Sequence, residues 1–237
     1  MWPFKRKPSP DTQRDSRSPV TPQANLVKRI GTRFGMVEIP SLDLLCASSV
    51  SPNGDYMIAW ADSSSDSRGT VGGHRAKGHG TFVFIANEKI LCQSKNLERP
   101  NKGKVADNGT FILIDAFFGT STDCDAYIFA KDGTEILRLR LTAKAVDTAI
   151  SADGRFAIIQ LAGSKTKDAN CLVFVDISER GIVWKSDAAG WADSYHFDND
   201  TQRLRLVYAD KGPYEYSYAG DFLSTKPRDQ DRVLSMR

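Results

Sequence analysis

The chain has 237 residues, of which 41% are hydrophobic and 26% are charged, and its formal net charge at pH 7 is +3. This length and composition fit one globular domain with a sizeable core. The charge is too small and too dispersed for a nucleic-acid footprint, so we expect no sequence-specific nucleic-acid binding. No stretch approaches the roughly 18 apolar residues of a membrane span, and no apolar run follows the basic start as in a secretory signal. We therefore expect a cytoplasmic protein.

The first 27 residues differ from the rest of the chain. Five of the ten prolines fall there, among polar and charged residues. Such a segment cannot bury enough apolar surface to offset the entropy of ordering it. We predict a disordered basic leader over residues 1–27, a repeat domain over 28–226 and a flexible tail over 227–237. Two aromatic residues and three cations lie within residues 1–7, and at about 1 kcal/mol per cation they are too few for stable attachment to an anionic membrane.

A short phrase recurs four times along the repeat domain. It is a turn with Asn or Asp beside Gly or Asp, followed by an apolar, β-branched or aromatic run. The copies begin at Asn53, Asn108, Asp153 and Asn199, which are 55, 45 and 46 residues apart. A period in this range is typical of stacked copies of one supersecondary unit.

Each copy continues with two more strand-like runs joined by a short loop, which is a hairpin signal. The paired runs are 82–85 with 90–92, 127–130 with 135–139, 172–175 with 182–184, and 214–218 with 222–223. A short strand also precedes each turn, as over residues 146–151. Four strands in about 45 residues are typical of a propeller blade. We predict an all-β fold, a small β-propeller-like array of about four four-stranded antiparallel blades.

The turn at residues 51–56, Ser-Pro-Asn-Gly-Asp-Tyr, and the turn at 151–156, Ser-Ala-Asp-Gly-Arg-Phe, carry a resemblance. They resemble the turn between the first two strands of WD40-like and YVTN-like β-propeller repeats. The resemblance covers residues 30 to 225 and concerns the repeat pattern, not one family. The regular Gly-His and Trp-Asp pairs of true WD40 repeats are missing. The resemblance implies a propeller fold and supplies no catalytic residue.

Four repeats are fewer than most closed propellers contain. The alternatives are a closed four-blade ring, an incomplete ring, or one ring shared by two chains, so the chain is expected to be a monomer or a homodimer. The segment 34–39 precedes the first repeat. We expect it to supply the strand that completes the last blade and thereby hides a sheet edge.

The first repeat contains an insertion. From Gly54 to the strand-like run at Phe82 the chain takes 28 residues, whereas the second and third copies take 18. The surplus falls within residues 63–80, and insertions in repeat proteins form loops on one face. The candidate binding residues for an acidic partner or a nucleic-acid backbone are His74, Arg75, Lys77 and His79, and the alternative is an insertion with no dedicated ligand. His-x4-His in a Gly-rich loop lacks a third ligand, so no metal site is predicted.

A second candidate site comes from aligning the repeats on their turns. Six residues before the turns stand Lys102, Asp147 and Asp193. In a propeller this position lies near the entry of the innermost strand, so the three side chains would form a small polar ring that binds a small ligand. The alternative is ordinary charged residues at strand edges.

Tyrosines mark the fourth repeat. Tyr214, Tyr216 and Tyr218 share one face of a strand because side chains alternate along it. Tyrosine is enriched at interaction hot spots, so Tyr214 and Tyr216 are further candidate binding residues. The alternative is that this face packs against the neighbouring blade.

The four cysteines form no Cys-x-x-Cys pair, which argues against a zinc knuckle or a redox pair. No Gly-x-Ser-x-Gly elbow and no acid pair at a defined spacing occurs. We predict no catalytic residue, no cofactor and no metal. The sequence favours a non-enzymatic protein-interaction or scaffold module whose partner is another protein. Two alternatives stay open: a small-ligand binder or enzyme with the 63–80 loop as a lid, and a peripheral membrane protein attached through residues 1–7.

Overall fold

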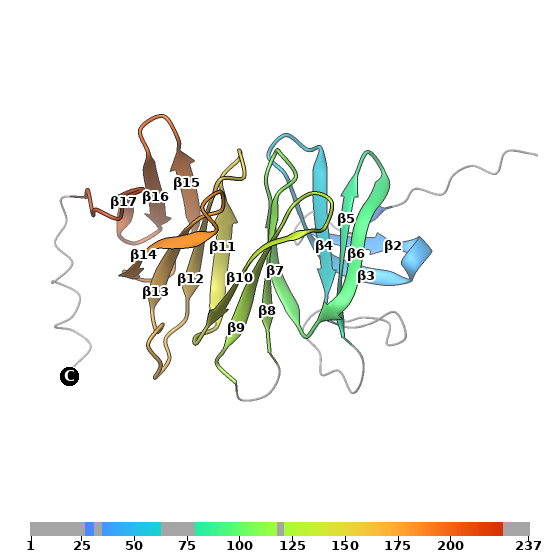
Figure 1. Ribbon diagram of the computed structural model, residues 1–237, viewed down its shortest axis with the longest axis horizontal. Helices are drawn as coiled ribbons and strands as arrows, with labels where there is room; N and C mark the ends of the chain where they lie inside the picture. The colour runs from blue at the N-terminus through green and yellow to red at the C-terminus, as the bar shows by residue number, and fades with distance from the viewer. Residues whose placement is uncertain (1–26, 31–34, 63–78, 118–120, 225–237) are drawn as a thin grey trace, which may run out of the picture.

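The computed structural model describes residues 27–30, 35–62, 79–117 and 121–224. Within these ranges the chain forms four antiparallel sheets in sequence order (Figure 1). The predicted leader up to residue 26, the tail from residue 225 and positions 63–78 of the insertion lie outside the described residues. In the described ranges no helix is long and apolar enough to cross a membrane.

The first sheet has six strands, in the order β1 (Lys28–Ile30), β2 (Met36–Ile39), β3 (Leu44–Val50), β4 (Tyr56–Ala61), β5 (Gly80–Ala86) and β6 (Lys89–Leu97). A 3-10 turn, η1 (Pro40–Leu42), joins β2 to β3. The second sheet contains β7 (Pro100–Val105), β8 (Phe111–Ala116), β9 (Cys124–Phe129) and β10 (Glu135–Leu141). The third contains β11 (Ala145–Ile150), β12 (Phe156–Leu161), β13 (Cys171–Asp176) and β14 (Gly181–Asp187). The fourth contains β15 (Ser194–Asp198), β16 (Arg203–Tyr208) and β17 (Gly212–Ser217), and a bridge from Tyr216 to Phe222 starts a fourth strand.

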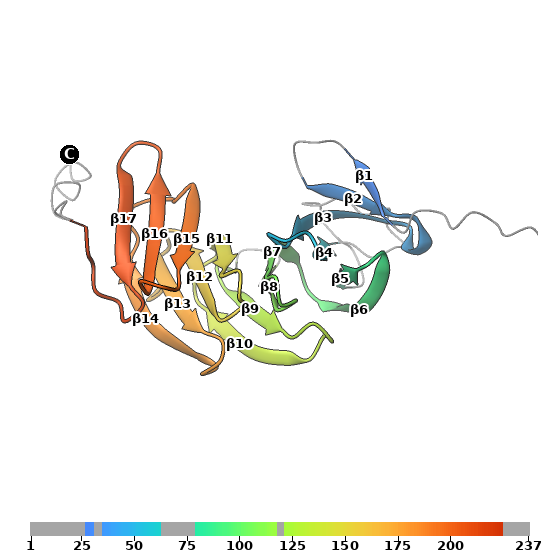
Figure 2. The ribbon, with the colours of Figure 1, turned by 90° about the horizontal axis from the view of Figure 1, so that it is seen from above.

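The sheets follow one another along an arc, with β7, β11 and β15 on its concave side (Figure 2). Adjacent sheets pack face to face through three hydrophobic clusters. Phe82, Phe84 and Phe111 lie in the cluster between the first and second sheets. Aliphatic side chains fill the second cluster, and aromatic rings such as Phe174 and Tyr216 fill the third. The all-β fold of antiparallel sheets is confirmed, and the second and third sheets have the four strands predicted for a blade.

The repeated turns connect neighbouring sheets directly. The amide of Asn53 donates to the Asp107 carboxylate of the second sheet (2.8 Å). Asn108 donates its side-chain amide to the carbonyl oxygen of Asp153 (2.7 Å), and Asn199 donates to the Asp153 carboxylate (2.8 Å). The Asn and Asp residues that shape each turn therefore also form a row of hydrogen bonds along the array.

The segment before the first repeat does not complete the last blade, so that expectation is wrong. Strand β2 pairs with β3, with Met36 opposite Ala47 and Ile39 opposite Leu44. Ile39 is fully buried, and it lies in one cluster with Val83 and Ile85 of β5. Residues of β2 and β5 meet because the first sheet curls over its own face (Figure 2). This curl buries an apolar face that would otherwise need another blade.

The other end of the array is polar. Strand β16 alternates buried Leu204 and Leu206 with exposed Arg203 and Arg205. The outward face of the fourth sheet therefore carries charged side chains where a following blade would require apolar ones. A terminal repeat with a polar outer face is typical of open repeat arrays. Among the described residues, the first and fourth sheets stand at opposite ends of the arc (Figure 2).

Candidate functional site

Three connectors link the four sheets, and a buried polar side chain holds each of them. Asp115 accepts the backbone amides of Glu98 (2.9 Å) and Arg99 in the first connector. Asp168 accepts the amide and the hydroxyl of Thr142 (2.8 and 2.9 Å) in the second. Buried hydrogen-bonding groups of this kind fix loops on the scaffold, because leaving them unpaired costs free energy.

The two carboxylates differ in their pKa values. Burial raises the pKa of Asp115 above its usual value, despite the two amides that it accepts. Burial also opposes ionisation of Asp168, but the Lys185 ammonium (2.7 Å from Oδ1) and the Thr142 donors outweigh it. The pKa of Asp168 is therefore lowered, and this side chain holds its connector as a carboxylate.

The third connector, residues 188–193, is held by Gln160 of β12, which is fully buried. Its Oε1 accepts the backbone amide of Ala192 (3.1 Å) and the hydroxyl of Tyr195 (2.6 Å). Its Nε2 donates to the carbonyl oxygen of Gly190. The backbone on both sides of residue 191 is therefore fixed.

The residue between these two contacts is Trp191, and its side chain is 70% exposed. Among the described large hydrophobic residues the next most exposed, Leu91, reaches 47%. Lys211 adds a further contact to the connector by donating to the carbonyl oxygen of Ala189 (2.7 Å). The connector thus presents an indole ring to solvent from a fixed backbone.

The structure places two of the three predicted ring residues beside this connector. Asp147 lies opposite Gln160 in the pairing of β11 with β12, and a bulge lies just before it, between Ala145 and Asp147. Asp193 ends the connector, and its carboxylate accepts the amide of Ala209 (2.6 Å). Lys102 lies one sheet away, on β7 opposite Ile114. Within the described part of the chain no ion pair joins these three residues, and the polar ring stays a prediction.

The negative charge of Asp147 also acts on the half-buried phenol of Tyr195. Burial, followed by the negative charge of Asp147 and then by Tyr208, raises the pKa of Tyr195. Tyr195 therefore stays protonated and donates its hydrogen bond to Gln160. This fixes Tyr195 and Gln160 at the junction between the third and fourth sheets.

Tyr214 and Tyr216 are not exposed, so the expectation that they form a contact surface is wrong. They are 6% and 0% exposed, respectively. The Tyr216 ring stacks on Trp184 with centroids 5.3 Å apart, and Tyr214 meets Phe222 edge-on. This strand face packs against the third sheet, because β16 and β17 have only one apolar face and the array ends there.

Three of the four residues predicted in the insertion, His74, Arg75 and Lys77, lie outside the described residues. His79 is described, and it is exposed just before β5. In the described ranges no three His, Cys, Asp or Glu side chains are grouped as metal ligands. The four cysteines are free thiols, and burial raises the pKa of Cys46 to about 12.

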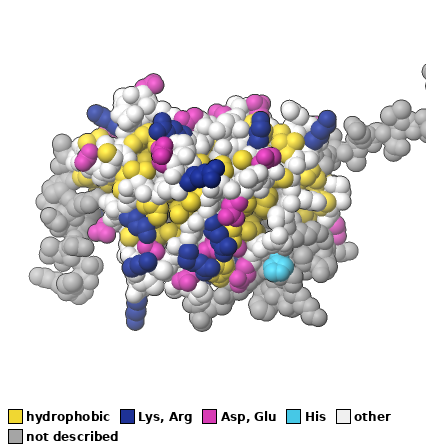
Figure 3. Space-filling view, viewed as in Figure 1, with side chains coloured by type: hydrophobic (Ala, Val, Ile, Leu, Met, Phe, Trp, Pro, Cys, Tyr) yellow, Lys and Arg dark blue, Asp and Glu magenta, His cyan; other side chains and the backbone are white. Residues whose placement is uncertain are grey.

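Figure 3 shows Lys and Arg side chains intermingled with Asp and Glu on the face viewed. The hollows of the described surface include one of about 350 Å³ beside the first turn and one of about 560 Å³ on the polar face of the fourth sheet. Trp191 and Gln160 were not among the sequence candidates. The signal that points to Trp191 is a lone indole within Ala188-Ala189-Gly190-Trp191-Ala192.

Comparison with solved structures identifies the fold. A segment of HIRA, residues 644–1017, matches with a TM-score of 0.51 and 11% identity over 73% of this chain and 52% of the other. The Dos1 propeller matches with a TM-score of 0.50 and 10% identity over 75% and 44%. The Myceliophteria thermophila Cps50 (Swd1) β-propeller domain matches with a TM-score of 0.46 and 11% identity over 81% and 66%. The chain thus spans about half the length of the first two structures.

The sequence itself gives no match to a family model and none to a curated protein. The structural likeness therefore concerns the fold alone. It agrees with the four antiparallel sheets, the row of turns and the face-to-face packing described above. The chain has a β-propeller-like fold of antiparallel blades.

Proposed function

We propose that this chain is a non-enzymatic protein-interaction module that anchors a partner protein on Trp191. The observation that carries the proposal is an indole that is 70% exposed on a connector held by Gln160 on both sides. Tryptophan is enriched among the few residues that dominate interface energies. Because the backbone under this side chain is already fixed, covering the indole costs no further ordering of the loop, and more of its burial appears as affinity.

The size of the contribution supports an anchor. Aromatic side chains bury roughly 150–250 Å² each. At about 25 cal/mol per Å², covering the exposed part of Trp191 contributes on the order of 3 kcal/mol. This is within the range of a binding hot spot, and it is more than an isolated surface ion pair supplies.

Replacing Trp191 by alanine is expected to reduce recovery of the partner by about tenfold or more, because a hot-spot truncation costs about 2 kcal/mol or more. The measurement uses the full chain as bait for cross-linking and quantitative mass spectrometry of the recovered proteins. Leu91→Ala is the matched control, because Leu91 is also an exposed apolar side chain (47%) but lies on β6.

The control should recover the same proteins as the unmodified chain. Circular dichroism should show equal melting temperatures for both variants, because Trp191 contributes little to the core. If Trp191→Ala recovers the same proteins in the same amounts, the proposed anchor is wrong.

A further inference from the structure

We infer that the partner segment docking at Trp191 is basic and places a Lys or Arg side chain between the indole and Asp147. This inference rests on the proposed function and names the chemistry of the partner. It starts from Gln160, which neighbours both residues. Gln160 lies opposite Asp147 in the β11–β12 pairing and binds the backbone on either side of Trp191. Asp147 and Trp191 are therefore both neighbours of Gln160, one across the strand pair and the other along the connector.

The charge at this junction is negative. In the part of the chain that the structure describes, Asp147 belongs to no ion pair. The Asp193 carboxylate accepts the amide hydrogen bond of Ala209 (2.6 Å). Lys211 is the cation that contacts the connector, and its ammonium is directed at the Ala189 carbonyl oxygen (2.7 Å). The formal charges of Asp147, Asp193 and Lys211 sum to −1, and a cation from the partner would compensate this charge.

The electrostatics of Tyr195 agree with this charge. The pKa of Tyr195 is raised by burial, by Asp147 and by Tyr208. The negative charge of Asp147 therefore acts at this junction. An acidic partner segment would be repelled by this negative charge.

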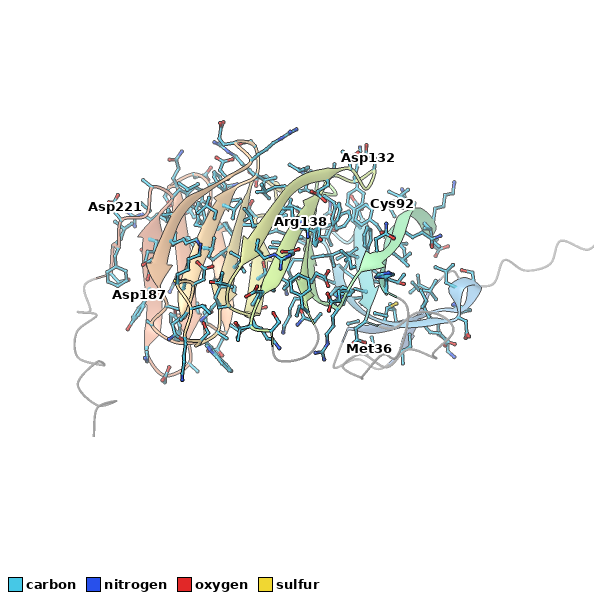
Figure 4. The ribbon with its side chains drawn as sticks, turned by 60° about the horizontal axis from the view of Figure 1, so that its bottom comes forward. Met36, Cys92, Asp132, Arg138, Asp187 and Asp221 are labelled. Atoms are coloured by element: carbon cyan, nitrogen blue, oxygen red, sulfur yellow. The ribbon has the colours of Figure 1, made fainter. Side chains whose placement is uncertain are left out.

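The same protein shows the proposed arrangement within its second sheet. Arg138 of β10 lies over the Tyr127 ring, with the guanidinium carbon 5.0 Å from the centroid, and its Nε donates to buried Asp125 (3.0 Å). Figure 4 labels Arg138 among the side chains of this sheet. An arginine held between an aromatic face and a carboxylate gains both the cation–π attraction and the ion pair. Trp191 and Asp147 offer the same two groups to an arginine or lysine from outside.

The test follows the indole N–H signal of Trp191 by nuclear magnetic resonance in the full chain, with the signal assigned through Trp191→Phe. The probes are N-acetyl-argininamide, N-acetyl-leucinamide and N-acetyl-glutamamide. We expect the arginine probe to shift the Trp191 signal far more than the other two. In Asp147→Asn the apparent affinity should fall about two- to fivefold, the size expected for one partly exposed ion pair. Asp55→Asn, in the first turn, is the control and should leave the affinity unchanged.

Equal shifts with the leucine and arginine probes, or an unchanged affinity in Asp147→Asn, would overturn the basic-partner inference. The proposed function would then still stand if Trp191→Ala loses the partner. If Trp191→Ala keeps the partner while the arginine probe binds as expected, the cation site is supported and the protein-anchor proposal fails. The two experiments therefore separate the two claims.

Discussion

Replacing Gly154 by alanine is expected to lower the free energy of unfolding by about 2–4 kcal/mol. Gly154 has a φ of +74°, where a side chain costs free energy. A Cβ there would also clash with Oδ1 of Asn108 and lie 2.6 Å from its Nδ2. Asn108 would have to move, and its hydrogen bond to the Asp153 carbonyl oxygen (2.7 Å) would be lost.

Gly54 provides the matched control for this substitution. It occupies the equivalent position of the first turn with a φ of +82°, but a Cβ there would meet no atom within 4 Å. Gly54→Ala should therefore lower the free energy of unfolding only by the cost of placing a side chain at positive φ, about 1 kcal/mol. Urea unfolding followed by circular dichroism measures both variants. Equal losses would show that the turns do not couple neighbouring sheets.

Phe174→Ala is expected to have the largest effect, a loss of about 3–5 kcal/mol, which is typical of removing a buried aromatic ring. Phe174 is fully buried on β13, within the aromatic cluster between the third and fourth sheets. Its ring centroid lies 5.1 Å from Trp184, 5.4 Å from Phe156 and 5.2 Å from Tyr218. Removing it leaves a cavity between the third and fourth sheets.

The loss should also be local. In a repeat array each unit contacts only its neighbours, so the fourth sheet should open before the first two. Amide hydrogen exchange should show lost protection over residues 194–217 and retained protection over 111–116. Val183→Ala, at a position that is 46% exposed on β14, is the control and should change stability by no more than about 0.5 kcal/mol. An equal loss of protection in all four sheets would contradict this expectation.

The repeat pattern predicted the fold because each turn has its own local chemistry. Gly54, Gly109 and Gly154 all adopt positive φ, which is the conformation that glycine accepts most readily. The runs that follow these turns became β4, β8 and β12. Local turn chemistry and alternating apolar residues are sufficient to predict such a unit, and they do so without long-range information.

The two ends of the array could not be predicted in the same way. The fourth turn contains four residues between its strands, 199–202, whereas the third contains five, 151–155. When a turn is one residue shorter, the opposite set of side chains on the following strand faces the core, because side chains alternate along a strand. A period of two therefore could not show that Tyr214 and Tyr216 point inward, and no pattern showed that β2 pairs with β3.

Two residues of the candidate site, Asp147 and Asp193, could be predicted from the sequence. Aligning the turns selected them, because each lies six residues before the start of a turn. Trp191 and Gln160 lie in a connector and at a strand end, where residue type follows no period. Their relation depends on the hydrogen bonds that Gln160 makes across 30 and 32 residues of sequence, to Gly190 and Ala192. Contacts at that separation come from packing and are not visible in a single sequence.

We propose that the four blades form an array that is finished at both ends, by the curled first sheet and by the polar face of the fourth. Light scattering behind size-exclusion chromatography on the full chain tests this proposal. We expect a monomer with the mass of one chain, 26.2 kDa. A stable dimer of twice that mass would contradict it if Arg205→Glu on the polar face dissociates it, because a second chain would then be completing the ring.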